Sequence, residues 1–115
     1  MSRNVLVLVT CGSAKEAKKI AEVLVRGRLA ACVNFLTSPV QSIYRWEGKV
    51  ETAKEYLLLI KTSRRRLAAL ERKIRHLHSY DVPEIIALPI VAGSKPYLKW
   101  LLESVATSEK NQSRS

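Results

Sequence analysis

The side chains best suited to chemistry are concentrated in one stretch, HLHSYDVPEIIALPI, which runs from His76 to Ile90. Two imidazoles, a phenol and two carboxylates, the latter from Asp81 and Glu84, precede a mostly apolar run. Copper and zinc prefer imidazole or thiolate and usually take at least three protein ligands. His76 and His78 are two residues apart, so at the end of a helix they point to different sides. The stretch therefore offers one well-placed imidazole and one nearby carboxylate, and a metal site needs a further residue.

Cys11 carries a thiol that could complete such a site. It follows the predicted first strand, Val5–Thr10, in the turn before the first helix. Lys15 and the N-terminus of that helix would lower the pKa of the thiol and favour a thiolate that reacts or binds metal. Two plainer interpretations remain open. Cys11 is a small turn residue, and His78 with Tyr80 forms hydrogen bonds across a helix–strand junction or a subunit cleft.

The bulk composition indicates one small, basic domain. The chain has 115 residues, of which 47% are hydrophobic, and we predict one domain over residues 1–106 and a disordered polar tail over residues 107–115. The net charge of +10 favours a polyanionic partner. However, the basic residues lie opposite apolar stripes on two predicted helices, as on solvated helix faces. No strand has the Lys/Arg-Gly-Phe pattern of RNA-recognition modules, so we expect no specific nucleic-acid partner.

The cysteine content predicts a reducing compartment. Cys11 and Cys32 are too few for a disulfide scaffold, and we expect Cys32 to be an inert packed thiol. The apolar run Val5–Val9 is shorter than the roughly 7–15 residues of an export signal. No segment approaches the roughly 18–20 apolar residues of a membrane span. We therefore expect a cytoplasmic protein without a membrane partner.

The hydrophobic periodicity predicts a β-α-β-β-α-β order followed by a C-terminal helix. Ser13 with Glu16 three residues later is a capping box that opens the first helix, and Gly27 ends that helix. Glu47-Gly48 is the turn of a long hairpin between the second and third strands. Two helices over one face of a four-stranded antiparallel sheet make an α+β, ferredoxin-like fold. The predicted strands are Val5–Thr10, Ala31–Leu36 resuming as Ser42–Trp46 after Pro39, Lys49–Thr62 and Glu84–Val91, and the helices start at Ser13, Ser63 and Pro96.

Several blocks of sequence carry a family likeness. They are LAACVN (Leu29–Asn34), SIYRWEGKVE (Ser42–Glu51), LLLIKT (Leu57–Thr62), YDVPEIIALPI (Tyr80–Ile90) and YLKWL (Tyr97–Leu101). In this order and spacing, from about Asn4 to Leu102, the chain resembles the CutA family of divalent-cation-tolerance proteins.

The resemblance implies a tight homotrimer of ferredoxin-like protomers, with the long hairpins helping to join subunits. It attaches no enzymatic reaction and no required cofactor, and in some bacterial members it implies binding of copper(II) or other divalent cations. We expect a divalent metal ion or a small molecule to bind in clefts between subunits. The expected cleft residues are Tyr44, Trp46, Lys61, His78, Tyr80 and Glu84, and the expected metal ligands are Cys11, His78 and Glu84.

The chain departs from the family pattern near these ligands. The family commonly reads His-Pro-Tyr where this chain has His78-Ser79-Tyr80. The copper-binding bacterial pattern has a further His where this chain has Leu77. That pattern also has its Cys within the end of the first strand, whereas we predict Cys11 to lie in the turn.

Two other functions suit the same fold. A trimeric signalling protein of the nitrogen-regulatory kind would bind a small organic anion in the intersubunit cleft, which fits the basic balance. An acylphosphatase-like hydrolase would need a phosphate-cradling loop with an Arg and a positioned Asn. Cys11-Gly12-Ser13 is the only loop-to-helix candidate and has no glycine-rich motif, so we predict no enzyme.

Overall fold

The strand β1 (Asn4–Cys11) lies in the middle of the sheet in the computed structural model, which describes residues 3–106. It pairs antiparallel with β4 (Lys49–Ser63) on one side and with β5 (Ile85–Pro89) on the other. The far side of β4 pairs first with β3 (Val40–Trp46) and then with β2 (Cys32–Phe35). The resulting order β2-β4-β1-β5 is that of a ferredoxin-like sheet in which β2 and β3 together act as one bent strand.

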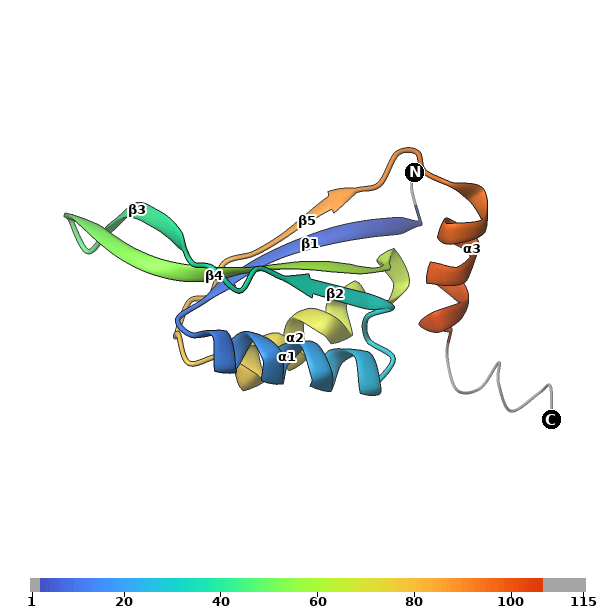
Figure 1. Ribbon diagram of the computed structural model, residues 1–115, viewed down its shortest axis with the longest axis horizontal. Helices are drawn as coiled ribbons and strands as arrows, with labels where there is room; N and C mark the ends of the chain where they lie inside the picture. The colour runs from blue at the N-terminus through green and yellow to red at the C-terminus, as the bar shows by residue number, and fades with distance from the viewer. Residues whose placement is uncertain (1–2, 107–115) are drawn as a thin grey trace.

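Two helices cover one face of this sheet, below it in Figure 1. Helix α1 (Ala14–Arg26) begins at the predicted cap, where the Ser13 hydroxyl accepts a hydrogen bond from the amide of Glu16 at 3.1 Å. Helix α2 (Leu67–Leu77) follows a short 3-10 turn, η1 (Arg64–Arg66). Both helices bury an apolar stripe against the sheet, which explains why their basic residues face solvent.

The core lies between the sheet and these two helices. Every second residue of β1 and β4 points toward the helices, because side chains alternate across a strand. The fully buried side chains include Val5, Val7, Val9 and Cys11 of β1, Leu58 and Ile60 of β4, Ile20 and Leu24 of α1, and Leu70 and Ile74 of α2.

The third helix, α3 (Lys95–Ser104), packs at one end of the sheet, with Pro96 in its first turn as predicted. Leu101 and Val105 form a second small apolar cluster with Ala31. Of the helices over residues 3–106, none is long and apolar enough to cross a membrane.

The other end of the molecule is a two-stranded ribbon that projects from the sheet (Figure 1). Residues 49–55 of β4 pair with β3 and, among the described strands, with no other. Glu47 and Gly48 form its turn with φ of 49° and 80°, as the type I′ hairpin geometry requires. The ribbon makes the molecule elongated, with extents of 53 × 27 × 25 Å.

The element order, the long hairpin and the helix cap are confirmed, but several boundaries differ from the prediction. The first strand continues through Cys11, which pairs with Tyr56 of β4. The prediction that Cys11 lies in a turn is therefore wrong, because its side chain belongs to the alternating buried series of β1. The last strand is shorter than predicted, since β5 covers Ile85–Pro89 and is the sheet edge that tolerates Pro89. The predicted polar tail, 107–115, lies outside the described residues.

Two of the serines that precede helices, Ser13 and Ser94, provide a test of local stabilisation. We expect Ser13→Ala to lower the free energy of unfolding by about 1 kcal/mol, because it removes the capping acceptor for α1. Ser94→Ala is the matched control. In the part of the chain that the structure describes, the Ser94 side chain makes no capping hydrogen bond to α3, so its effect should be smaller. Urea unfolding at one protein concentration measures both, and equal losses would contradict the assignment.

Candidate functional site

A groove lies where the projecting hairpin meets the body of the molecule. It has a volume of about 680 Å³ and lies between one side of the hairpin, the end of β1 and the segment that leads into β5. Its lining residues are Thr10, Ser42, Ile43, Tyr44, Trp46, Glu55, Tyr80, Asp81, Val82, Pro83 and Glu84. Four of the six expected cleft residues are therefore brought together in one protomer, namely Tyr44, Trp46, Tyr80 and Glu84.

Strand alternation and pairing decide which hairpin side chains reach the groove. Ser42, Tyr44 and Trp46 occur at every second position of β3 and so share one face. Val40 pairs with Glu55, which places the Glu55 side chain on this same face. The connection from α2 to β5 supplies Asp81 and Glu84, which line the opposite wall on either side of Pro83.

Glu55 and Tyr80 form the polar centre of the groove. Glu55 is only 7% exposed, although it carries a carboxylate. Burial of the Tyr80 phenol, together with its hydrogen bond to the Glu55 carboxylate, raises the pKa of Tyr80 to about 12. The phenol therefore stays protonated at neutral pH and donates to Glu55, which satisfies a buried charge that would otherwise be costly.

His78 lies behind the groove and does not line it. Its side chain is fully buried, with Nε2 2.8 Å from the carbonyl oxygen of Thr10 and Nδ1 3.0 Å from the amide nitrogen of Tyr80. A carbonyl can only accept and an amide can only donate, so the neutral Nε2–H tautomer satisfies both contacts. The interpretation of His78 as a residue that holds the helix–strand junction by hydrogen bonds therefore agrees with the geometry.

Glu16 of α1 fixes the same junction from below. One of its carboxylate oxygens accepts from the amide of Ser79 at 2.8 Å, and the other contacts the Ser79 hydroxyl at 3.1 Å. The first of these oxygens is also 3.6 Å from Nδ1 of His78. A proline at position 79 could make neither contact, because it lacks both the hydroxyl and the backbone N–H.

The Cys11 thiol is buried and protonated rather than activated. Burial, followed by the nearby charge of Glu16, raises the pKa of Cys11 from 9.0 to about 11. Its Sγ is 3.5 Å from the carbonyl oxygen of Ser13. The expectation that Lys15 and the helix N-terminus lower this pKa is therefore wrong, because desolvation and a carboxylate dominate.

The three expected metal ligands do not form a ready cluster. In residues 3–106 the structure contains no group of three or more His, Cys, Asp or Glu side chains arranged to hold a metal ion. Of the expected set, only Glu84 lines the groove, while Cys11 and His78 are buried behind it. Within one protomer these three residues do not converge, and their joint role as ligands stays a prediction.

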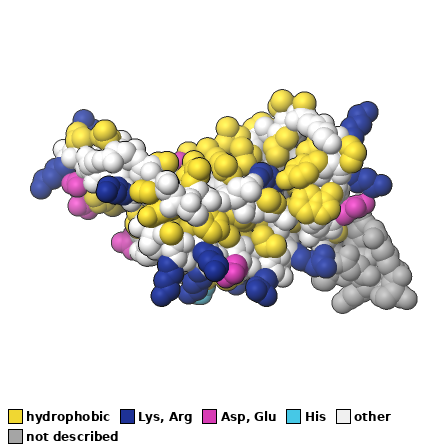
Figure 2. Space-filling view, in the orientation of Figure 1, with side chains coloured by type: hydrophobic (Ala, Val, Ile, Leu, Met, Phe, Trp, Pro, Cys, Tyr) yellow, Lys and Arg dark blue, Asp and Glu magenta, His cyan; other side chains and the backbone are white. Residues whose placement is uncertain are grey.

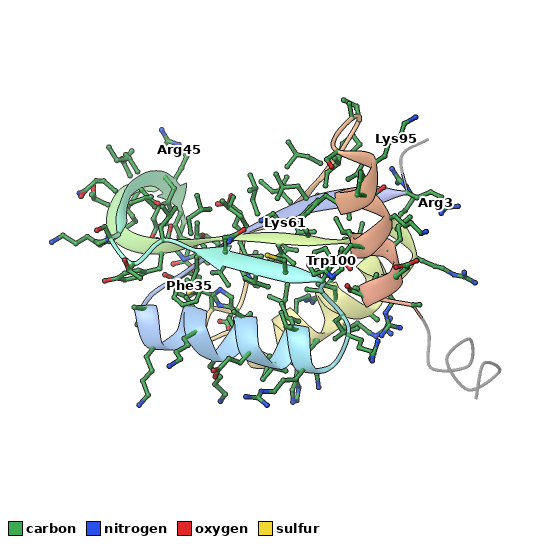
Figure 3. The ribbon with its side chains drawn as sticks, turned by 45° about the vertical axis from the view of Figure 1, so that its right-hand side comes forward. Arg3, Phe35, Arg45, Lys61, Lys95 and Trp100 are labelled. Carbon is green, nitrogen blue, oxygen red and sulfur yellow. The ribbon has the colours of Figure 1, made fainter. Side chains whose placement is uncertain are left out.

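Lys61 lies along the sheet between the hairpin and α3, as Figure 3 shows. It pairs with Leu6 of β1 and Cys32 of β2, and its Nζ hydrogen-bonds to Oδ1 of Asn34. The same Nζ is 3.9 Å from the Cys32 sulfur. Cys32 is accordingly half-buried with polar neighbours rather than packed in the core. Lys61 does not line the groove of one protomer, and its place in an intersubunit cleft stays a prediction.

The charge of the groove is opposite to that of the whole chain. Glu55, Asp81 and Glu84 line it, whereas no Lys or Arg of the described residues does. Figure 2 shows many of the Lys and Arg side chains along the lower side of the molecule, where the helices lie. With three aromatic rings beside three carboxylates, the groove favours a positively charged ligand.

Sequence reasoning missed Glu55 as a site residue. It stands between Lys54 and Tyr56 in the predicted strand Lys49–Thr62, where the sequence pattern alone gives it no role. The pattern did contain a signal, because Glu55 precedes the apolar run Tyr56–Ile60 and is the first residue beyond the part of β4 that pairs with β1. Only the position of Tyr80 shows that this carboxylate is buried.

The comparison with known proteins agrees with this architecture. The sequence matches the profile of the family described as CutA1 divalent ion tolerance protein over residues 5–104. The chain belongs to this family. It is 48% identical over 99 residues to the divalent-cation tolerance protein CutA of Thermus thermophilus, a match that covers 86% of this chain and 95% of the relative.

Solved structures of family members share the fold. The chain superposes on the T. thermophilus divalent cation tolerance protein with a TM-score of 0.87 at 46% identity, covering 90% of this chain and 99% of that one. Some family members are longer. A relative from Arabidopsis thaliana, named Protein CutA, chloroplastic, is 46% identical over 101 residues, which are 88% of this chain but 55% of the relative. The chain thus spans about half the length of that protein.

The raised pKa of Cys11 predicts a loss of stability in alkali. Between pH 9.0 and about 11 the unfolded thiol releases its proton while the folded thiol keeps it, so rising pH favours unfolding. We expect the wild-type protein to lose up to about 1.4 kcal/mol per pH unit more than Cys11→Ala across this window. Urea unfolding at several pH values measures the difference, with Cys32→Ala as the control thiol. Parallel curves for wild type and Cys11→Ala would show that burial does not hold the proton on the thiol.

Proposed function

We propose that the chain acts as a non-enzymatic, homotrimeric cation-binding protein of the divalent-cation-tolerance type. Its ligand cleft is the carboxylate-lined groove at the base of the hairpin, completed by a neighbouring copy. The observation that carries this proposal is the unpartnered apolar surface that continues from the open face of the sheet to the hairpin.

The open sheet face presents leucine and isoleucine side chains opposite the helices. Leu6 pairs with Leu88, and Leu8 pairs with both Ile86 and Leu59, so these residues share one face. Ile86 and Leu88 are 49% and 40% exposed. Figure 2 shows hydrophobic side chains gathered above the sheet in this region. Contiguous apolar surface of this kind marks an interface between proteins.

The hairpin supports the same assembly. A two-stranded ribbon is marginally stable by itself in water, yet this one projects with Ile43 71% and Val50 65% exposed. Glu55 shares the open face with Leu57 and Leu59, because these residues alternate along β4. The groove therefore opens on the side of the sheet that a second copy would cover, which supports a cleft between subunits.

The ligand is proposed to be a cation. The carboxylates of the groove supply oxygen ligands for a divalent ion, and copper(II) is the test metal that the family resemblance suggests. The family and its T. thermophilus member are named for tolerance of divalent ions or cations. A small organic anion, the alternative for a nitrogen-regulatory type of protein, is not favoured, because it would meet three carboxylates. We also propose a cytoplasmic location, which the two free cysteines support.

Light scattering during size-exclusion chromatography tests the trimer. The wild-type protein should elute at about 39 kDa, three times the 13.0 kDa protomer. Ile86→Arg should shift it toward the protomer mass, because the charge would be buried in the interface. Val25→Arg is the matched control, because Val25 is 43% exposed and lies on α1, on the side of the sheet away from the open face. An Ile86→Arg protein that stays trimeric would refute assembly through the open face.

Equilibrium dialysis with copper(II) tests the cleft. We expect Glu84→Gln to weaken binding about tenfold or more, because it removes a ligand charge. Cys11→Ala should weaken binding less than Glu84→Gln does, since its thiol is buried and protonated in the protomer. Glu103→Gln, on the exposed side of α3, is the control for a general loss of negative charge. If instead Cys11→Ala abolishes binding and Glu84→Gln does not, the site lies at the thiol and the groove is not the metal cleft.

A further inference from the structure

We infer that the groove binds an organic cation, a ligand with an ammonium or guanidinium group on an apolar stem, between Trp46, Tyr44 and the three carboxylates. The inference rests on the proposed function in one respect, that this groove is a ligand cleft. It goes further by assigning the chemical class of the ligand.

The first support is the distribution of charge. The chain carries 20 Lys and Arg residues against 10 Asp and Glu. Three of those ten acidic side chains nevertheless line one groove, and none of the Lys or Arg side chains of residues 3–106 does. The three carboxylates attract a cation to this groove, whereas the basic faces of α1 and α2 repel it.

The second support is the spacing of the carboxylates. A bare metal ion needs several ligand atoms that converge at about 2.0–2.6 Å. In the described part of the chain, no group of His, Cys, Asp or Glu side chains converges in this way. The groove measures about 680 Å³, within the roughly 300–1,000 Å³ that is typical of organic ligand sites. The groove of one protomer therefore suits an organic molecule, which can contact carboxylates that lie apart, better than a metal ion, which needs several ligand atoms close to one point.

The third support is the aromatic wall. Tyr44 and Trp46 are 45% and 48% exposed and lie two residues apart on one face of β3. Within the protomer both rings line the groove rather than the core, and indole is the strongest of the aromatic partners for a cation. Tyr80 contributes a third ring from the opposite segment. Rings beside carboxylates solvate an organic cation by cation–π attraction and by charge together.

The orientation of the ligand follows from two further residues. Glu55 is the most deeply buried carboxylate of the groove, and its bond to Tyr80 holds it in place. Lys49 pairs with Trp46 near the tip of the hairpin and lies outside the lining. The positive group is therefore placed between the rings of Tyr44 and Trp46 and the carboxylates of Glu55 and Glu84. The apolar stem extends along Val82 and Pro83, which also line the groove.

A set of three probes with the same four-carbon chain tests the charge preference. In a Trp100→Phe background Trp46 is the only tryptophan, so its fluorescence reports on the groove. Butylammonium should change this fluorescence saturably and at lower concentration than butanol or butyrate. Adding salt should weaken the butylammonium response, because charge contributes to binding.

Two variants with matched controls test the named residues by calorimetric titration with butylammonium. In the wild-type background, Trp46→Leu keeps an apolar side chain but removes the cation–π partner, and Glu84→Gln removes one charge. Each should weaken binding at least about fivefold. Trp100→Leu and Glu103→Gln, both on α3, should leave the affinity unchanged.

The outcomes separate this inference from the proposed function. Equal binding of the three probes, or no binding while copper(II) still requires Glu84, would overturn the organic-cation inference and leave the proposed cleft standing. If neither copper(II) nor butylammonium depends on Glu84, both proposals fail, whatever the mass of the assembly. A charge-selective response lost in Trp46→Leu supports the inference.

Discussion

The pairing of β4 with three other strands is the interaction on which the rest of the structure depends. The C-terminal half of this 15-residue strand pairs with β1 and β2 and belongs to the part of the sheet that α1 and α2 cover. Its N-terminal half, residues 49–55, pairs only with β3 among the described strands. A strand so much longer than its central neighbour must project. The projection creates both the apolar overhang and the angle in which the groove lies.

Glu55 stands where β4 leaves the body of the sheet. After Glu55 the strand pairs with β1, from Tyr56 onward. Up to and including Glu55 it pairs with β3. A carboxylate at such a point is buried only if a donor reaches it, and Tyr80 does so from a segment 25 positions away in sequence. The same segment carries His78 and Ser79, which bind β1 and α1. The hydrogen bonds of His78 and Ser79 therefore hold the segment that places Tyr80 in the wall of the groove.

Much of this fold could be predicted from the sequence, because the signals are local. The Ser13–Glu16 cap, the Glu47-Gly48 turn and the alternation in Leu57–Thr62 each depend on neighbours a few residues away. The site was harder to predict. Tyr44, Trp46, Tyr80 and Glu84 were expected in the cleft and line the groove, whereas His78 faces the protein interior and Lys61 lies elsewhere on the sheet. Side-chain type does not reveal which way a residue points at a junction.

The sequence by itself determined the ferredoxin-like order, the long hairpin and the family, since periodicity, caps and spaced blocks are all written along the chain. Only the tertiary structure decided the state of the chemistry-bearing residues. Cys11 belongs to the buried series of β1, so desolvation keeps its thiol protonated. The two nitrogens of His78 meet a carbonyl and an amide brought from distant and local segments. Burial and hydrogen-bond partners depend on contacts across the fold, and these turned a suspected thiol–imidazole site into an acidic, aromatic groove.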